Sequence, residues 1–101
     1  MYMERFEVLY REFAKLVHNF FYYKGVALSE VEDLVQEVFM RLYKGYVDRL
    51  DGMDEVELKK LLYTIAKNVW REWVRSSIKH QTYAFDDSFD QAETFEEATE
   101  I

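Results

Sequence analysis

Three residue types are absent or scarce in this chain, and each absence narrows the possible folds and sites. Cysteine is absent, which excludes disulfides and thiolate metal sites and fits a reducing compartment. Proline is absent and only three glycines occur, which favours helices over a turn-rich β fold. No apolar run approaches the ~20 residues of a membrane span, and the N-terminus does not resemble a signal peptide. We therefore expect a cytoplasmic, all-α protein without membrane insertion.

The chain is rich in hydrophobic residues, and its charges are unevenly distributed. Half of the 101 residues are hydrophobic and 18% are aromatic, enough for the core of one small domain. Residues 1–80 contain all 13 Lys and Arg and are neutral overall, but residues 59–80 are strongly basic. Residues 81–101 contain acids and no base. This asymmetry is typical of a nucleic-acid-binding face followed by a segment that avoids or mimics nucleic acid, although a solvated helix and a solubilising tail would carry the same charges.

Apolar residues at helical spacing predict three long helices, over residues 4–23, about 29–46 and about 54–80. Residues 81–101 lose this strong period, although a few phenylalanines keep a faint helical spacing among the acids. We therefore predict a small bundle of three to four helices in residues 1–80, followed by an acidic, disordered tail or linker over residues 81–101.

Short local patterns predict where these helices begin and end. Gly25 is expected to stop the first helix. Ser29 and Glu32 are spaced as a capping box that would open the second helix. Asp54, three residues before Glu57, is expected to cap the third helix after a turn.

The predicted outer face of the second helix carries polar side chains that suit a protein partner. Asp33, Gln36, Glu37 and Met40 follow a spacing of i, i+3, i+4 and i+7, with Arg41 beside them. Such a ridge can lie against another helix and pair with its Lys or Arg side chains. An ordinary solvated face is the alternative.

The predicted outer face of the third helix suits nucleic acid. Lys and Arg neutralise phosphates, and an amide such as that of Asn68 can pair with a base edge. Tyr63 and Trp70 flank this strip; exposed, they would stack on unpaired bases, and otherwise they belong to the edge of the core. The candidate DNA-binding residues are Lys60, Tyr63, Lys67, Asn68, Trp70, Arg71, Arg75 and Lys79.

Catalytic and metal-binding patterns are missing from the sequence. His18 and His80 fall on different predicted helices, and no His, Cys or Asp cluster has metal-ligand spacing. A glycine-rich phosphate loop is also absent. We expect neither an enzyme nor a resident metal or cofactor.

Two sequence runs resemble region 2 of bacterial sigma factors, and the likeness is greatest to the extracytoplasmic-function branch. They are DLVQEVF at residues 33–39 and LYTIAKN at residues 62–68. The resemblance covers roughly residues 6–80. It implies a transcription initiation factor domain whose partners are the RNA polymerase core and promoter DNA.

The resemblance also assigns roles to the two helices and to the loop between them. It implies that Asp33, Gln36, Glu37, Met40 and Arg41 contact the clamp helices of the polymerase β′ subunit. It further implies that the third helix recognises the promoter −10 element as single-stranded non-template DNA and helps to open it. The loop that would capture a flipped-out base consists of Leu50, Asp51, Gly52, Met53, Asp54 and Glu55.

Departures from the family pattern leave a second interpretation open. No helix-turn-helix domain for the −35 element follows, so the chain is expected to be an excised domain or a protein reduced to region 2. Glu72 replaces the usual Asp, and the capture loop is acidic. The alternative is an interaction module that binds polymerase or an anti-sigma protein without reading DNA. The tail would either solubilise the chain or compete with DNA for the basic helix, with Phe85 and Phe89 docking on Trp70.

Overall fold

The computed structural model describes residues 2–77 and 94–98, with side chains at residues 7–76 and 94–96. These parts contain helices and no strand, which confirms the predicted all-α fold, and none of their helices is long and apolar enough to cross a membrane. The elements are α1 (Tyr2–Tyr23), α2 (Leu28–Tyr46), the 3-10 helix η1 (Leu50–Gly52), α3 (Glu55–Ser77) and α4 (Phe95–Ala98).

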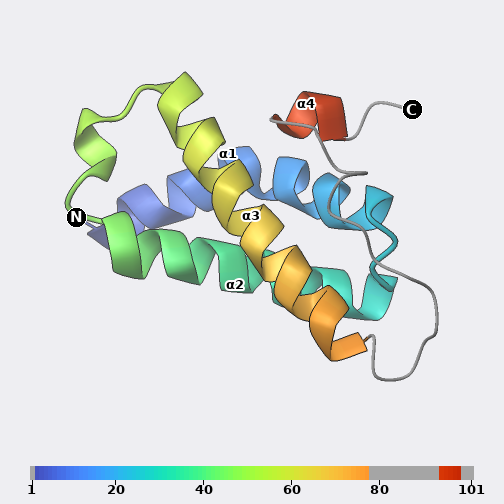
Figure 1. Cartoon of the computed structure of the whole chain (residues 1–101). Helices are drawn as coiled ribbons and strands as arrows, with labels where there is room; N and C mark the ends of the chain where they lie inside the picture. The colour runs from blue at the N-terminus through green and yellow to red at the C-terminus, as the bar shows by residue number, and fades with distance from the viewer. Residues whose placement is uncertain (1, 78–93, 99–101) are drawn as a thin grey trace.

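The three long helices pack around one core. α1 and α2 form an antiparallel hairpin, and α3 crosses this hairpin diagonally, contacting both helices (Figure 1). The short α4 lies against α1 (Figure 1). The largest side chains with less than 2% exposure that fill the core are Phe20, Phe21, Phe39, Phe95, Leu42, Leu62, Val17, Val31 and Val38.

Gly25 ends α1, as the sequence predicts. Its φ of 85° lies in the left-handed region that glycine adopts without strain. The amide of Gly25 donates to the carbonyl of Tyr22, and the amide of Val26 donates to that of Phe21, both at 3.1 Å. This is a Schellman motif, and the buried side chains of Val26 and Phe21 provide the hydrophobic contact that often accompanies it.

The starts of α2 and α3 differ in their N-caps. Asp54 caps α3, since its Oδ1 accepts a hydrogen bond from the amide of Glu57 at 2.8 Å; this prediction is confirmed. The predicted capping box at Ser29 is wrong. α2 begins one residue earlier than Ser29, and its N-cap is Ala27, which makes no side-chain hydrogen bond. Ser29 therefore lies inside the first turn, where its hydroxyl cannot act as the cap.

Phe95, in the described part of the acidic tail, belongs to the core. Phe95 is 1% exposed and belongs to the same hydrophobic cluster as the three long helices. The expectation that the tail is disordered is therefore wrong for residues 94–98. Burying one phenylalanine side chain contributes about 1.5–3 kcal/mol, which offsets part of the entropy lost when these residues are ordered. Phe85, Phe89 and the rest of the predicted tail lie outside the described residues.

Candidate nucleic-acid and protein interfaces

The polar ridge predicted on α2 faces outward. Asp33 and Gln36 are exposed, and Met40 retains 45% of its exposure. The opposite face of the helix is buried because hydrophobic residues recur at helical spacing there. Glu37 and Arg41 border the exposed residues and are partly buried. The structure therefore places all five predicted residues along one side of one helix.

Arg41 connects this ridge to α3. Its Nε donates to Oε2 of Glu37 at 2.8 Å, one helical turn earlier. Its Nη1 and Nη2 donate to the two carboxylate oxygens of Glu72 at 2.9 and 2.7 Å. The hydrogen bond to Glu72, and then that to Glu37, raise the pKa of Arg41, and the hydrogen bond from Arg41 lowers the pKa of Glu72. The sequence placed Arg41 beside the ridge and gave no sign of its partner 31 residues away.

The basic strip predicted on α3 forms a narrow polar surface. Its members are separated by three or four residues or are direct neighbours, so they follow one side of the helix. Lys67 and Arg71 are partly buried and the others are exposed. Lys79 lies outside the described residues. The strip consists of the predicted Lys60, Lys67, Asn68, Arg71 and Arg75 together with Thr64, which lies between Lys60 and Lys67.

The aromatic residues beside this strip belong to the core. Tyr63 is 3% exposed and Trp70 is 8% exposed, so neither presents a free face to a base. The Tyr63 ring lies edge-on to Phe20 with centroids 5.5 Å apart. The ammonium group of Lys24 lies 5.0 Å from the centroid of the Trp70 ring. Of the two alternatives that the sequence left open for these aromatics, the structure supports packing rather than exposure.

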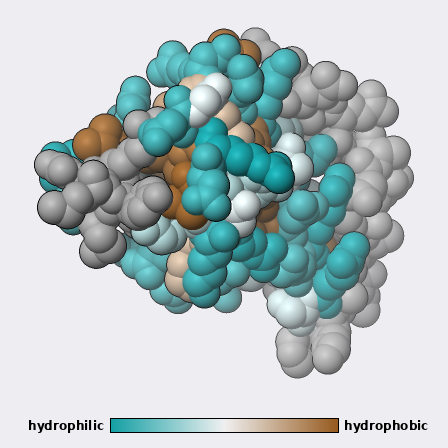
Figure 2. Space-filling model, turned by 90° about the vertical axis from the view of Figure 1, so that its left-hand side faces the viewer, coloured by the Kyte–Doolittle hydropathy of each residue, from teal (hydrophilic) through white to brown (hydrophobic). Residues whose placement is uncertain are grey.

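The loop over residues 50–55 turns its apolar side chains inward. Leu50 is 4% exposed, and Met53 packs against the core. The exposed residues of the loop are mainly acidic, and Asp54 is committed to capping α3. The end of the molecule that carries this loop is mostly hydrophilic, with small hydrophobic patches (Figure 2). Capture of a base in this loop would require Leu50 or Met53 to turn outward.

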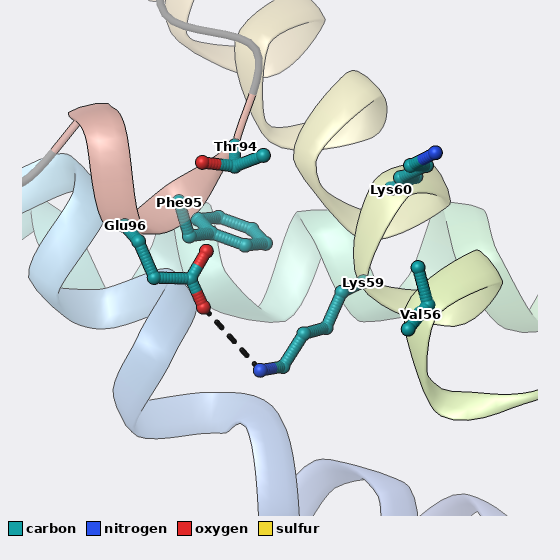
Figure 3. Close-up of a pocket in the computed structure, with 6 residues that line it drawn as sticks. All are labelled: Val56, Lys59, Lys60, Thr94, Phe95 and Glu96. Carbon is teal, nitrogen blue, oxygen red and sulfur yellow. Dashed lines mark hydrogen bonds and ion pairs between the residues drawn. The ribbon is translucent and has the colours of Figure 1, made fainter.

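A pocket of about 220 Å³ lies between α3 and the segment that contains α4 (Figure 3). Phe95 forms part of its wall, and Lys59 Nζ donates to Glu96 Oε1 at 3.3 Å across it. The sequence did not single out these residues, and their only signal was the faint helical spacing of the tail phenylalanines. The described residues hold no group of three His, Cys, Asp or Glu side chains suited to a metal ion.

A family comparison covers both candidate surfaces. The family model described as Sigma-70 region 2 matches residues 9–79, which include all of α2 and all of α3. No curated protein and no solved structure gives a significant match. Domains of this family are transcription initiation factor domains rather than enzymes; they bind RNA polymerase and recognise the promoter −10 element. Because the match spans well over half of the 101 residues, the chain belongs to the sigma-70 region 2 family.

Proposed function

We propose that this chain is the region 2 domain of a sigma factor of the extracytoplasmic-function branch. In this proposal α2 binds the clamp helices of the polymerase β′ subunit, and α3 holds the non-template strand of the opened −10 element. One observation carries the proposal: within the matched residues, an exposed acidic-polar ridge and an exposed basic strip lie on two helices that pack against each other.

The ridge on α2 has the chemistry of a protein-binding surface. Asp33 and Glu37 offer carboxylates to the Arg or Lys side chains of a partner helix. Gln36 adds an amide, and Met40 adds an adaptable apolar contact. Arg41 is proposed to act mainly by orienting the carboxylate of Glu37, since its guanidinium is already hydrogen-bonded to two carboxylates.

The strip on α3 has the chemistry of a phosphate-binding surface. Lys60, Lys67, Arg71 and Arg75 neutralise phosphates, and Asn68 contributes to sequence preference. Lys79 is proposed to extend the strip. Tyr63 and Trp70 support the strip from the core rather than stacking on bases in this conformation. Base capture by residues 50–55 stays part of the proposal and requires a rearrangement of the loop.

The polymerase contact is tested by reversing charge on the ridge. The double variant Gln36→Ala, Glu37→Lys is expected to weaken binding to the isolated β′ clamp helices by more than tenfold, because like charges at an interface cost several kcal/mol (roughly). Glu32→Lys makes the same charge change at an exposed position of α2 outside the ridge and should have little effect. Unchanged affinity of the double variant would contradict the assignment.

The DNA contact is tested by the salt dependence of binding to single-stranded oligonucleotides. Arg71→Ala and Arg75→Ala should each lower the slope of log K against log salt by about 0.7, the value for one phosphate on a single strand. Arg11→Ala, at an exposed cation of α1, is the matched control and should keep the parent's slope. A parent chain that binds the clamp helices but no DNA would instead support the interaction-module alternative, with polymerase or an anti-sigma protein as partner.

A further inference from the structure

Residues 94–96 cover an aromatic surface where α1 meets α3. The centroid of the Phe95 ring lies 5.8 Å from that of Phe20 and 5.1 Å from that of Tyr63. Phe20 and Tyr63 are themselves 5.5 Å apart, and all three rings meet nearly at right angles. This edge-to-face arrangement is the favourable one for aromatic rings, and it leaves Phe95 almost completely buried.

Lysine side chains border this aromatic surface. Lys59 pairs with Glu96, and Lys60 lines the same pocket from the next position of α3 (Figure 3). The hydrogen bond to its own backbone amide, and then that to Lys59, lower the pKa of Glu96, so the carboxylate is charged at neutral pH. The Lys59 and Glu96 side chains are 37% and 62% exposed, so their attraction is modest and is screened by salt.

We propose that this surface, made of Phe20, Tyr63, Lys59 and Lys60, is a docking site for an acidic segment that contains a phenylalanine. Residues 94–96 of the chain itself are its occupant, and they compete there with single-stranded DNA. The competition rests on the proposed function, whereas the docking does not.

The occupant resembles one nucleotide in its chemistry. The Phe95 ring is a flat apolar group that packs edge-on against Tyr63 of α3, and it occupies the place where an unpaired base would stack on that ring. The Glu96 carboxylate stands beside Lys59, where a phosphate would release counterions. While residues 94–96 are docked, Tyr63 cannot contact a base, and Glu96 partly neutralises the charge of Lys59.

Residues 94–96 are covalently attached to the domain, so they fill the docking site even where their intrinsic affinity for it is low. A covalently attached segment acts at a millimolar local concentration, far above that of DNA in most assays. The apparent affinity for DNA falls in proportion to the open fraction, so a site that is 80–90% closed binds about 5–10 times more weakly.

The experiment uses the full chain and two kinds of measurement. Phe95→Ala removes the anchor, Glu96→Gln removes the charge, and Glu100→Gln makes the same charge change outside the described residues. The NMR signals of the Tyr63 ring report docking, and fluorescence anisotropy with labelled single-stranded oligothymidine reports DNA binding. Phe95→Ala is expected to shift the Tyr63 signals and to tighten DNA binding by about 5–10-fold at low and high salt. Glu96→Gln should give a smaller gain that fades with salt, and Glu100→Gln should match the parent.

Each contrary outcome overturns a distinct part of the proposal. Unchanged Tyr63 signals in Phe95→Ala would overturn the docking. Shifted signals with unchanged DNA affinity would overturn the competition. Absence of DNA binding in all variants would overturn the competition together with the DNA part of the proposed function, while the Tyr63 signals would still decide the docking. If circular dichroism shows that Phe95→Ala is unfolded, Phe95→Leu and Glu96→Lys replace it in both measurements.

Discussion

α2 and α3 are both long amphipathic helices, and they are buried to different extents. The buried residues of α2 follow one side, and the ridge on its other side stays open. α3 is buried more widely, because Tyr63, Ala66, Trp70 and Val74 are buried beside its apolar stripe of Leu58, Leu62, Ile65 and Val69. Both helices contact the other two long helices, and α3 differs in that its Tyr63 also meets Phe95 of the tail.

This difference teaches how to interpret aromatic residues beside a charged strip. Where a further segment packs on a helix, as Phe95 does on Tyr63, the core reaches further around the circumference and includes such residues. α2 therefore offers a broad surface to a partner, whereas the surface that α3 offers is a narrow line of charged and amide groups.

The comparison is tested most strongly by Trp70→Ala. If Trp70 is core, as its 8% exposure indicates, the variant should lose about 3–5 kcal/mol of unfolding free energy. The matched variant Met40→Ala, on the open side of α2, should change it by less than about 0.5 kcal/mol. Urea denaturation measures both, and equal effects would mean that α3 is buried no more widely than α2.

The connections before and after α2 should also respond differently. Gly25→Ala places a side chain at a φ of 85° and is expected to cost about 1–2 kcal/mol. Gly52→Ala, in η1, meets no atom within 4 Å and has no positive φ. It should leave stability unchanged or raise it by less than about 1 kcal/mol. Thermal denaturation of the two variants would sharpen the comparison, and a larger loss for Gly52→Ala would contradict it.

Removing the polar side chain at the starts of α3 and α2 should change the unfolding free energy by amounts that differ by about 1 kcal/mol. Asp54→Ala removes the hydrogen bond to the amide of Glu57 and should destabilise the chain by this amount. Ser29→Ala removes a hydroxyl that does not cap α2, so it should have almost no effect. Guanidinium denaturation distinguishes the two variants. A loss of unfolding free energy in Ser29→Ala as large as that in Asp54→Ala would show that Ser29 does cap α2.

The smallest expected effect concerns the bridge between the two helices. Arg41→Ala removes the hydrogen bonds to Glu37 and Glu72, and because these groups are over one-third exposed, the loss should stay below about 1 kcal/mol. The pKa of Glu72 is lowered, so the stability from this pair is present above its ordinary value of 4.5 and is lost as pH falls through the lowered value.

Denaturation across this acidic range should therefore show a steeper loss in the parent than in Arg41→Ala. Arg11→Ala, at an exposed arginine of α1, is the control and should keep the parent's pH dependence. Identical profiles for the parent and Arg41→Ala would mean that the bridge between the helices contributes no stability.

Features set by local sequence were predictable, and features set by contacts between distant residues were not. Helical spacing identified the three long helices, Gly25 identified the end of α1, and Asp54 identified the start of α3, because each depends on neighbours along the chain. The prediction for Ser29 failed because two possible N-caps, Ala27 and Ser29, lie two residues apart, and the local pattern does not decide between them.

The same distinction holds for the candidate surfaces. Spacing placed Asp33 and Gln36 correctly on the exposed side of α2. The burial of Tyr63 and the bridge from Arg41 to Glu72 depend on how α3 crosses the bundle, which one helical pattern cannot reveal. The burial of Phe95 could not be predicted for another reason. Its acidic neighbours suggested disorder, and only the packed rings of Phe20 and Tyr63 explain its burial.

The buried position of Phe95 has a practical consequence for making this domain. A fragment that ends at residue 80 would uncover the rings of Phe20 and Tyr63, which Phe95 packs against in the full chain. Exposed apolar patches promote self-association. A short fragment chosen to match the family boundaries would therefore be more prone to precipitate than the full chain, and purification is better served by keeping the last residues.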